Sequence, residues 1–455
     1  MSAEDTVATS ATASPADPAE EAAGSAANAI TRRGFLRVAG LTGGGLVAVS
    51  VAACAPAAVP AWSFGAPATP GAATTPPAAS SATPAASAAA TPAASASASA
   101  SPAPNMPAGW TLHDISARNV VRRYLGNLVP ALKGIYGDVA FAKLAEILGA
   151  ADNYPELALK PAFVQVPQLV LNDALTPLKP EVVGGVKVFR LTIDEMDWPI
   201  DELKPTVKAL GYNKQWPGPT IRVTEGDKVR AIFTNNLTET TSVHFHGQEF
   251  KDFFQDGVPF VTQLPIIPGE AYTYEFTPSR PGSLMYHSHH NAAVQQGNGL
   301  LGPFIVDPKT PTADDKFDRE YTWISDDVLG GFTINGHGFP ATVPVLAAQG
   351  ETVRIRFQNQ GTMIHPWHLH GNRMKVVARD GFPLGSAAFY CDTLSVSPGE
   401  RYDVNVVAET PGVWAFHCHI LPHAEGADGM FGMVSTLMTV PKASDVDAII
   451  AALVA

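Results

Sequence analysis

The sequence predicts an all-β protein that contains two copies of one sandwich domain. From about residue 183, short runs of alternating apolar and polar residues are separated by Gly, Pro, Asn and Asp, as is typical of β-strands and their turns. The copies form an internal repeat, in which GDKVRAIFTN (226–235) matches GETVRIRFQN (350–359) and PGSLMYHSH (281–289) matches PGVWAFHCH (411–419). Each copy is about 120 residues long, which suits a Greek-key β-sandwich.

A short helical segment is predicted ahead of the two β-domains. Apolar residues such as Val121, Leu125 and Leu128 recur at three- and four-residue spacing, which favours two or three short helices. We assign residues 108–182 to a helical and irregular lead-in, 183–308 to the first β-domain and 309–445 to the second. Nothing in the lead-in indicates a chemical role.

The N-terminal residues indicate an export signal. Residues 31–37 (TRRGFLR) form a twin-arginine pattern, followed by an apolar run at 41–53 that is too short to span a membrane permanently. Residues 51–54 (VAAC) resemble a bacterial lipobox with Cys54 as the lipid-bearing residue; the alternative is ordinary cleavage near this point. We expect residues 1–54 to direct export by the twin-arginine route to an extracytoplasmic location, with Cys54 as a candidate membrane anchor.

Composition bounds the remaining possibilities. Residues 55–107 are mostly Ala, Pro, Ser and Thr, so they predict a disordered tether without a core. The formal net charge of −12 argues against nucleic acid or an anionic lipid surface as a partner. The three cysteines, Cys54, Cys391 and Cys418, are too few for a disulfide framework.

Histidines indicate a metal cluster. Eight of the 13 histidines fall into four His-x-His pairs, two in each repeat. The pairs are His244/His246, His287/His289, His368/His370 and His417/His419. One ion takes three or four such ligands, so the pairs predict a cluster of two or three ions where the repeats meet, and imidazole suits copper or zinc.

A thiol between two of these histidines predicts a second metal centre. Alternate side chains of a β-strand point to opposite faces, so Cys418 faces away from His417 and His419. A lone thiolate with two histidines and a distant methionine suits blue copper. The second repeat offers His365, Cys418 and His423, with Met430 downstream. Ser288 replaces the cysteine in the first repeat, so only the second copy can hold this centre.

The four ligand motifs resemble those of multicopper oxidases. They are HFHG (244–247), HSH (287–289), HPWHLHG (365–371) and HCHILPH (417–423). With two repeats, the chain is similar to the two-domain, laccase-like branch over roughly residues 185 to 442. The resemblance implies cupredoxin-like domains that couple one-electron oxidation of a phenolic or similar reductant to reduction of dioxygen to water. It also implies a homotrimer and four copper ions per chain: one type 1, one type 2 and two type 3.

The resemblance implies a ligand set for each copper ion, when the family's ligand positions are carried over to the matching motifs of this sequence. The type 1 copper would be held by His365, Cys418 and His423, and the type 2 copper by His244 and His368. The type 3 pair would be held by His246, His287, His289, His370, His417 and His419. The usual axial position, five residues after the last type 1 histidine, holds Asp428, and the loop looks two residues longer. We therefore favour Met430 over Met433 as the axial ligand.

Two carboxylates are candidate proton relays. Asp256, within QDG (255–257), matches the family's acidic residue near the cluster, although Asp-Gly can also simply form a turn. Glu425 is the weaker candidate. His113, His290 and His337 are expected to be structural.

Other functions remain open on the sequence alone. A close alternative keeps the coppers but oxidises a metal ion such as Fe(II) or Cu(I). A two-domain copper nitrite reductase needs one catalytic copper at the domain interface, and four histidine pairs exceed that need. A non-enzymatic copper carrier would not need a cluster, and a copper store would need repeated Met or Cys ligands.

Overall fold

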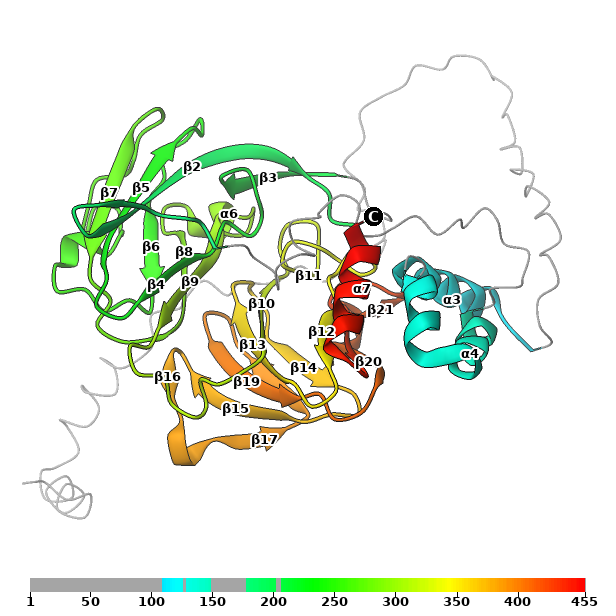
Figure 1. Cartoon of the computed structure of the whole chain (residues 1–455). Helices are drawn as coiled ribbons and strands as arrows, with labels where there is room; N and C mark the ends of the chain where they lie inside the picture. Colours follow the sequence, from blue (N-terminus) through cyan, green and yellow to red (C-terminus); the bar gives the residue numbers. More distant parts are fainter. Residues whose placement is uncertain (1–108, 126–127, 149–176, 202–205, 455) are drawn as a thin grey trace, which may run out of the picture. The chain divides into compact units, whose positions relative to one another are not determined.

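The computed structural model describes residues 109–125, 128–148, 177–201 and 206–454 (Figure 1), all within one unit that spans residues 96–455. The expected export signal, Cys54, the tether at 55–107 and residues 149–176 of the lead-in lie outside the described residues. The described part consists mostly of β-strands. The prediction of an all-β protein with two sandwich domains is confirmed.

The first sandwich is built from strands β1 to β9. Their bounds are β1 (Glu181–Val183), β2 (Val186–Trp198), β3 (Val207–Tyr212), β4 (Ile221–Thr224), β5 (Lys228–Asn235), β6 (Val243–His246), β7 (Ala271–Phe276), β8 (Gly282–Ser288) and β9 (Leu301–Asp307). One sheet has the order β1-β2-β5-β7 with β3 on β2, and the other has the order β4-β9-β8-β6. Inward residues of both sheets, such as Phe233, Phe245 and Tyr286, form one apolar core.

The second sandwich is built from the strands that follow. Their bounds are β10 (Arg319–Asp326), β11 (Thr333–Ile334), β12 (Val345–Ala348), β13 (Thr352–Asn359), β14 (His365–Leu369), β15 (Met374–Arg379), β16 (Phe382–Pro383), β17 (Phe389–Cys391), β18 (Thr393–Val396), β19 (Arg401–Val407), β20 (Gly412–Cys418) and β23 (Val434–Val440). The sheets are β11-β10-β13-β19-β15-β16, with β17 on β15, and β12-β23-β20-β14-β18. A separate two-residue hairpin joins β21 (Glu425–Gly426) to β22 (Gly429–Met430).

The two sandwiches share one topology, as the sequence repeat predicts. Strand β2 runs parallel to β5, and β10 runs parallel to β13 in the same relation. Likewise β6 pairs with β8 as β14 pairs with β20, so the histidine motifs occupy matching strands. The second sandwich adds β15 to β18 between the strands that match β6 and β7.

Helices cover one sheet of the second sandwich. Helices α3 (Leu112–Leu125), α4 (Val129–Leu148) and α7 (Ala443–Val454) form one apolar cluster with β12 and β23. Tyr124, Leu132, Met438 and Ile449 are buried in this cluster. Helix α7 was not foreseen from the sequence. Shorter helices are α6 (Ala292–Gln295), η3 (Phe253–Gln255), η4 (Gly385–Ala387) and η5 (Leu421–His423). Within the described part of the chain, no helix has the length and apolar character needed to cross a membrane.

A buried charge network joins the two sandwiches. Glu320 on β10 accepts hydrogen bonds from Arg222 on β4 and from Arg356 on β13. Arg356 also bonds to Asp403 at 2.9 Å and to the Ser283 hydroxyl on β8 at 2.8 Å. The network therefore connects the β4-β9-β8-β6 sheet of the first sandwich to the β10-β13-β19 strands of the second.

We expect Glu320→Gln to destabilise the protein at neutral pH. Burial by itself would raise the pKa of Glu320, but the charges of Arg356 and Arg222 outweigh it and lower the pKa from 4.5 to about 2. A carboxylate whose pKa is lower in the folded than in the unfolded protein stabilises the fold at any pH above its unfolded-state pKa. This stabilisation is lost as the pH falls from the unfolded-state pKa, about 4.5, to the folded-state pKa, about 2. The shift corresponds to about 3 kcal/mol in the free energy of unfolding.

Denaturant unfolding of both proteins over a pH series measures this effect. The difference in the free energy of unfolding between wild type and Glu320→Gln should fade as the pH falls from about 4.5 to about 2. A difference that does not depend on pH would contradict the role assigned to the Glu320 carboxylate. Glu275→Gln, which removes an exposed partner of Arg230, is the matched control and should cost below about 1 kcal/mol.

Candidate metal centres

Three ligands of the predicted type 1 set converge inside the second sandwich. His365, Cys418 and His423 present ligand atoms that all lie within 4.8 Å of one another. The Cys418 sulfur lies 3.8 Å from Nδ1 of His365 and 3.6 Å from Nδ1 of His423. All three side chains are buried, so this is an enclosed N₂S donor set.

Strand alternation separates this set from the neighbouring histidines. On β20, Cys418 is fully buried in the sandwich core beside Trp367, while His417 pairs with His368 on the other face. On β14, His365 shares the inward parity of Trp367, and His368 has the opposite parity. The two strands therefore place His365 and Cys418 on the inner face, and His368 and His417 on the opposite face.

A carboxylate that the motifs did not indicate holds His365. Asp327, just after β10, accepts a hydrogen bond from Nε2 of His365 at 3.0 Å. Its oxygens also accept bonds from the Thr362 amide and hydroxyl and from the Met363 amide. Burial would raise the pKa of Asp327, but these donors lower it to about 2, so it stays anionic. Because Nε2 donates, Nδ1 of His365 is left to bind a metal beside the sulfur.

The packing favours Met433 over Met430 as the residue beside the thiol. Met433 is fully buried in the same core cluster as Cys418. Its amide donates to the His423 carbonyl at 2.9 Å, and its carbonyl accepts from the Cys418 amide at 3.0 Å. Met430 instead packs against the cluster formed by the helices. Met433 therefore shares a core cluster with the thiol, whereas Met430 packs towards the helices.

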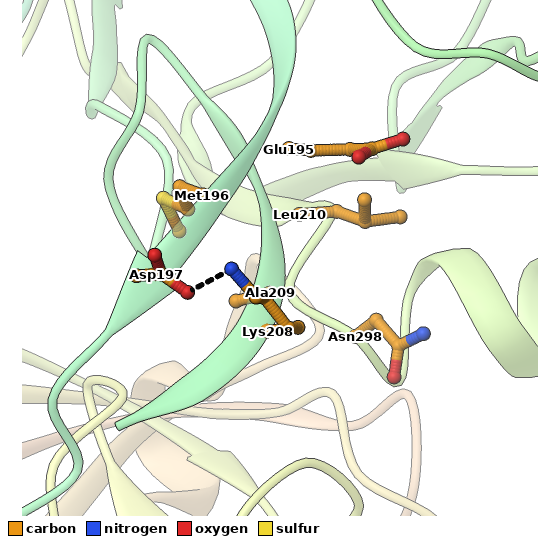
Figure 2. A pocket seen from close by; sticks show the side chains of 7 residues that line it. All are labelled: Glu195, Met196, Asp197, Lys208, Ala209, Leu210 and Asn298. Atoms are coloured by element: carbon orange, nitrogen blue, oxygen red, sulfur yellow. Dashed lines mark ion pairs between the residues drawn. The ribbon is translucent and has the colours of Figure 1, made fainter.

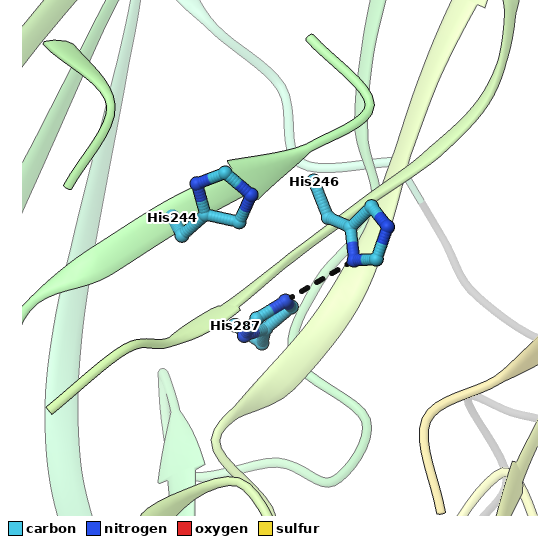
Figure 3. A group of neighbouring side chains, drawn as sticks. All are labelled: His244, His246 and His287. Carbon is cyan, nitrogen blue, oxygen red and sulfur yellow. Dashed lines mark hydrogen bonds between the residues drawn. The ribbon is translucent and has the colours of Figure 1, made fainter. Parts of the chain in front are cut away.

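The first sandwich gathers its own histidines on β6 and β8. His244, His246 and His287 present ligand atoms within 4.8 Å of one another (Figure 3). His287 Nε2 lies 3.4 Å from His246 Nδ1. The rings of this set, which includes the exposed His289, have centroids 5.4–6.4 Å apart.

The second sandwich gathers a matching set on β14 and β20. Ring centroids of His368, His370, His417 and His419 lie 4.9–5.8 Å apart. Nε2 of His370 approaches Nε2 of His417 to 3.1 Å. His370 and His419 are exposed. Among the described residues, no ring contact joins a histidine of this set to one of the first.

Backbone carbonyls orient several of these rings. Nδ1 of His244 donates to the Asp256 carbonyl at 2.7 Å, Nδ1 of His287 to the Ser288 carbonyl at 2.9 Å, and Nδ1 of His417 to the Cys418 carbonyl at 3.0 Å. Each bond fixes the proton on Nδ1 and leaves the Nε2 lone pair for a metal. This is opposite to the arrangement at His365.

Burial keeps His246 and His287 of the first sandwich neutral. Burial, assisted by the charge of Arg401, lowers the pKa of His246 to about 3. Burial also lowers the pKa of His287 to about 4. Metal ligation needs neutral imidazole, so these rings need lose no proton on binding a metal near neutral pH.

The first sandwich fills its counterpart of the thiol site with hydrogen bonds. By the repeat alignment, Thr241 stands where His365 stands and Ser288 stands where Cys418 stands. The fully buried Gln295 accepts from Thr241 at 2.8 Å and from Ser288 at 2.6 Å. The two hydroxyls at these positions are thus satisfied by hydrogen bonds.

The two candidate proton relays lie in different places. The Asp256 carboxylate, partly exposed, lies 3.4 Å from Nδ1 of His244. Glu425 is exposed on β21, where it pairs with Met430 in the hairpin after His423. Among the described residues, no hydrogen bond or ion pair links Glu425 to a histidine of either set.

The remaining histidines have ordinary partners. His337 is buried, bonds to the Ile200 carbonyl at 3.2 Å and contacts Trp198. His290 bonds to the Thr240 hydroxyl at 2.9 Å. His113 bonds to the Ala427 carbonyl in the loop after His423.

A surface pocket lies apart from the ligand sets. It has a volume of about 540 Å³ and lies between β2, β3 and Asn298 (Figure 2). Its lining contains the exposed ion pair between Lys208 and Asp197, at 2.6 Å, and none of the predicted site residues.

The donor sets fit copper. A thiolate with two imidazoles and a methionine nearby is the ligand set of blue-copper centres, and imidazole clusters also suit copper. Burial raises the pKa of the Cys418 thiol to about 11, so a bound cation is required to hold the sulfur as thiolate.

Comparisons with known proteins agree with this chemistry. Family models described as multicopper oxidase match residues 193–311 and 309–437, which together make up more than half of the chain. A blue copper oxidase from Nitrosomonas europaea is 31% identical, with a TM-score of 0.53 over 56% of this chain and 86% of that one.

Curated relatives match a smaller share of their own length. Iron transport multicopper oxidase FET5 of Saccharomyces cerevisiae is 31% identical over 230 residues, 44% of this chain and 36% of the relative. Laccase-1 of Botryotinia fuckeliana is 33% identical over 228 residues, 44% of this chain and 39% of the relative. The chain spans less than half the length of these curated relatives.

We expect Asp327→Asn to weaken metal binding at the thiol set. The amide cannot hold His365 as a charged acceptor does, and loss of such a partner typically costs roughly 10- to 100-fold in metal affinity. The copper affinity is measured by titration against a competing chelator, monitored through the visible absorption of the copper–thiolate complex. Asp392→Asn is the matched control, because this exposed carboxylate lies 4.0 Å from His368. Equal affinities for wild type and Asp327→Asn would contradict the role of Asp327.

Proposed function

The chain belongs to the multicopper oxidase family, and on this premise we propose that it is a laccase-like oxidase. It would couple four one-electron oxidations of a phenolic or similar reductant to reduction of one dioxygen, with four protons, to two waters. Bound copper would supply the redox steps and the place of dioxygen reduction. We assign four copper ions per chain: type 1 at His365, Cys418 and His423, and the others at the two histidine sets.

The orientation of residues 417–419 carries this proposal. Cys418 faces the enclosed N₂S set, whereas His417 faces the histidine set on the other side of β20. A few covalent bonds therefore separate the two groups of ligands. A single storage or structural metal site does not require such a link.

Asp256 is the proposed proton relay. Its carbonyl orients His244 and its carboxylate lies beside the same ring. Being partly exposed, the carboxylate can exchange protons with solvent and pass them towards the histidine set. Glu425, which lies two residues after His423, has no bond to either histidine set among the described residues, so its support as a relay is weaker.

The surface near the type 1 ligands favours an organic reductant. Met363 and Ile364, which directly precede His365, are exposed, and so is Leu421, two residues before His423. Large exposed apolar side chains suit an aromatic molecule better than a hydrated cation. The nearby Asp327 carboxylate is 1% exposed and is already fully engaged by donors.

A metal ion is the second candidate reductant. One curated relative is named as an iron transport multicopper oxidase, so Fe(II), with Cu(I) beside it, remains a required comparison. Nitrite reduction needs only one catalytic copper at a domain interface, and copper carriage or storage needs no histidine cluster. The two histidine sets therefore favour oxidase chemistry over these two functions.

Oxygen uptake by the copper-loaded protein tests the proposed function. We expect uptake with a phenol to exceed uptake with Fe(II) or Cu(I), with no turnover of nitrite. Faster uptake with Fe(II) or Cu(I) would make the protein a metallo-oxidase, and nitrite turnover without oxygen uptake would overturn the proposal. Cys418→Ser is the matched variant: it should lose the blue colour and the uptake while retaining most of the copper of the histidine sets.

We also propose that the cluster forms between subunits of a homotrimer. The histidine sets lie on separate sandwiches, and His289, His370 and His419 are exposed. Exposed apolar side chains follow the first histidine motif, at Phe253, Phe254, Phe260, Val261 and Leu264. A head-to-tail contact that places one chain's first set on its neighbour's second set can close into a ring.

Subunit complementation tests this arrangement. His246→Ala damages the first set and His370→Ala the second, so each variant alone should be inactive. The two variants are then mixed in equal amounts, dissociated or unfolded, and reassembled. Roughly a quarter of the interfaces should then combine an intact first set with an intact second set and recover activity. If the cluster formed within one chain, the mixture would stay inactive.

Export by the twin-arginine route, with a lipid anchor at Cys54, completes the proposal. Its support is the pattern TRRGFLR at 31–37 and VAAC at 51–54. Such a route carries folded proteins, so copper could be bound before export.

A further inference from the structure

The loop that joins the last type 1 histidine to Met433 carries a hairpin of its own. Strands β21 and β22 contain two residues each, and their register pairs Glu425 with Met430 and Gly426 with Gly429. A two-stranded hairpin this short is not stable alone in water. The loop therefore needs a packing partner to keep a defined position.

Helix α3 of the lead-in is that partner. The Cβ of any residue replacing Gly429 would lie 2.5 Å from the Ala117 Cα and 2.8 Å from the Ala117 Cβ. Gly429 also has φ +99°, a backbone conformation that favours glycine. Helix and loop thus meet with no room for a side chain at this position.

Two further contacts fix the loop on the helix. Nδ1 of His113, in the first turn of α3, donates to the Ala427 carbonyl at 2.6 Å. Met430 packs into the apolar cluster of the helices, as does Ala424, which directly follows the ligand His423. Contacts to the helices therefore occur near the start of the loop, at the hairpin turn and at its second strand.

The helices are anchored to the same sheet that carries the ligands. The Tyr124 hydroxyl lies 3.1 Å from the Thr436 hydroxyl on β23, and the Tyr136 hydroxyl donates to the Thr439 carbonyl at 2.7 Å. Strand β23 begins directly after Met433 and pairs with β20, which carries Cys418. The position of α3 is thus defined relative to β20, the strand that carries Cys418.

We propose that α3 is a clamp that positions the loop between His423 and Met433, next to the residues that would hold the type 1 copper. It captures Met430 and the hairpin, and so holds His423 and Met433 at the two ends of the loop. This inference rests on the proposed copper function and gives the lead-in helices a role in it. Ala117, His113 and Gly429 are positioning residues because they act through the loop; among the described residues, no hydrogen bond joins them to a ligand side chain.

Ala117→Leu in the full-length, copper-loaded protein tests the clamp. The larger side chain should displace the hairpin and move Met433 relative to the Cys418 thiol. In the copper-loaded protein Met433 would supply a weak sulfur donor, and loss of that donor would stabilise Cu(II) less, so the type 1 reduction potential should rise. We expect at least a tenfold change in the one-electron equilibrium, about 59 mV, with a shifted sulfur-to-copper absorption band. His113→Ala should shift both in the same direction by a smaller amount.

Ala142→Leu is the matched control, because it makes the same change at an exposed position of α4. The clamp is supported if Ala117→Leu alters the band and the potential and Ala142→Leu does not. It is overturned if both variants behave alike, or if Ala117→Leu and His113→Ala lower only the melting temperature. A wild-type protein that binds copper without a blue band would refute the proposed function itself, which is a separate result.

Discussion

The alternation of side chains along β20 is the constraint on which the site depends. Because Cys418 points into the sandwich core, its sulfur can meet His365 and His423 in an enclosed, largely apolar environment. Because His417 has the opposite parity, it joins a histidine set on the outer face. A shift of register by one residue would exchange the two faces and destroy both sets together.

The surroundings of the ligands are specialised to match. At His365 the Nε2–H donates to the buried carboxylate of Asp327, whereas at His244 and His287 the Nδ1–H donates to backbone carbonyls. The ring nitrogen left for a metal therefore differs between the two kinds of centre. In the first sandwich, Gln295 accepts hydrogen bonds from Thr241 and Ser288, the residues at the positions of His365 and Cys418.

The elements around the sandwiches hold these faces in place. The network of Glu320 and Arg356 joins the sandwiches across buried charges, which are stable only while each keeps its partners. Helices α3, α4 and α7 cover the β12-β23 side of the second sandwich, and α3 extends this cover to the loop after His423. A segment without any chemical motif thus becomes part of the neighbourhood of a metal site.

The sequence alone determined the parts of this protein that depend on spacing. The repeat predicts two sandwiches of one topology, and the parity of 417, 418 and 419 predicts which ligands share a face, because strand geometry converts spacing directly into direction. Only the tertiary structure could indicate Asp327, Gln295 and the preference for Met433, because these depend on which distant segments and loop conformations meet in the core. The same reason applies to α3, whose contact with Gly429 joins residues far apart in the chain and leaves no pattern in either segment.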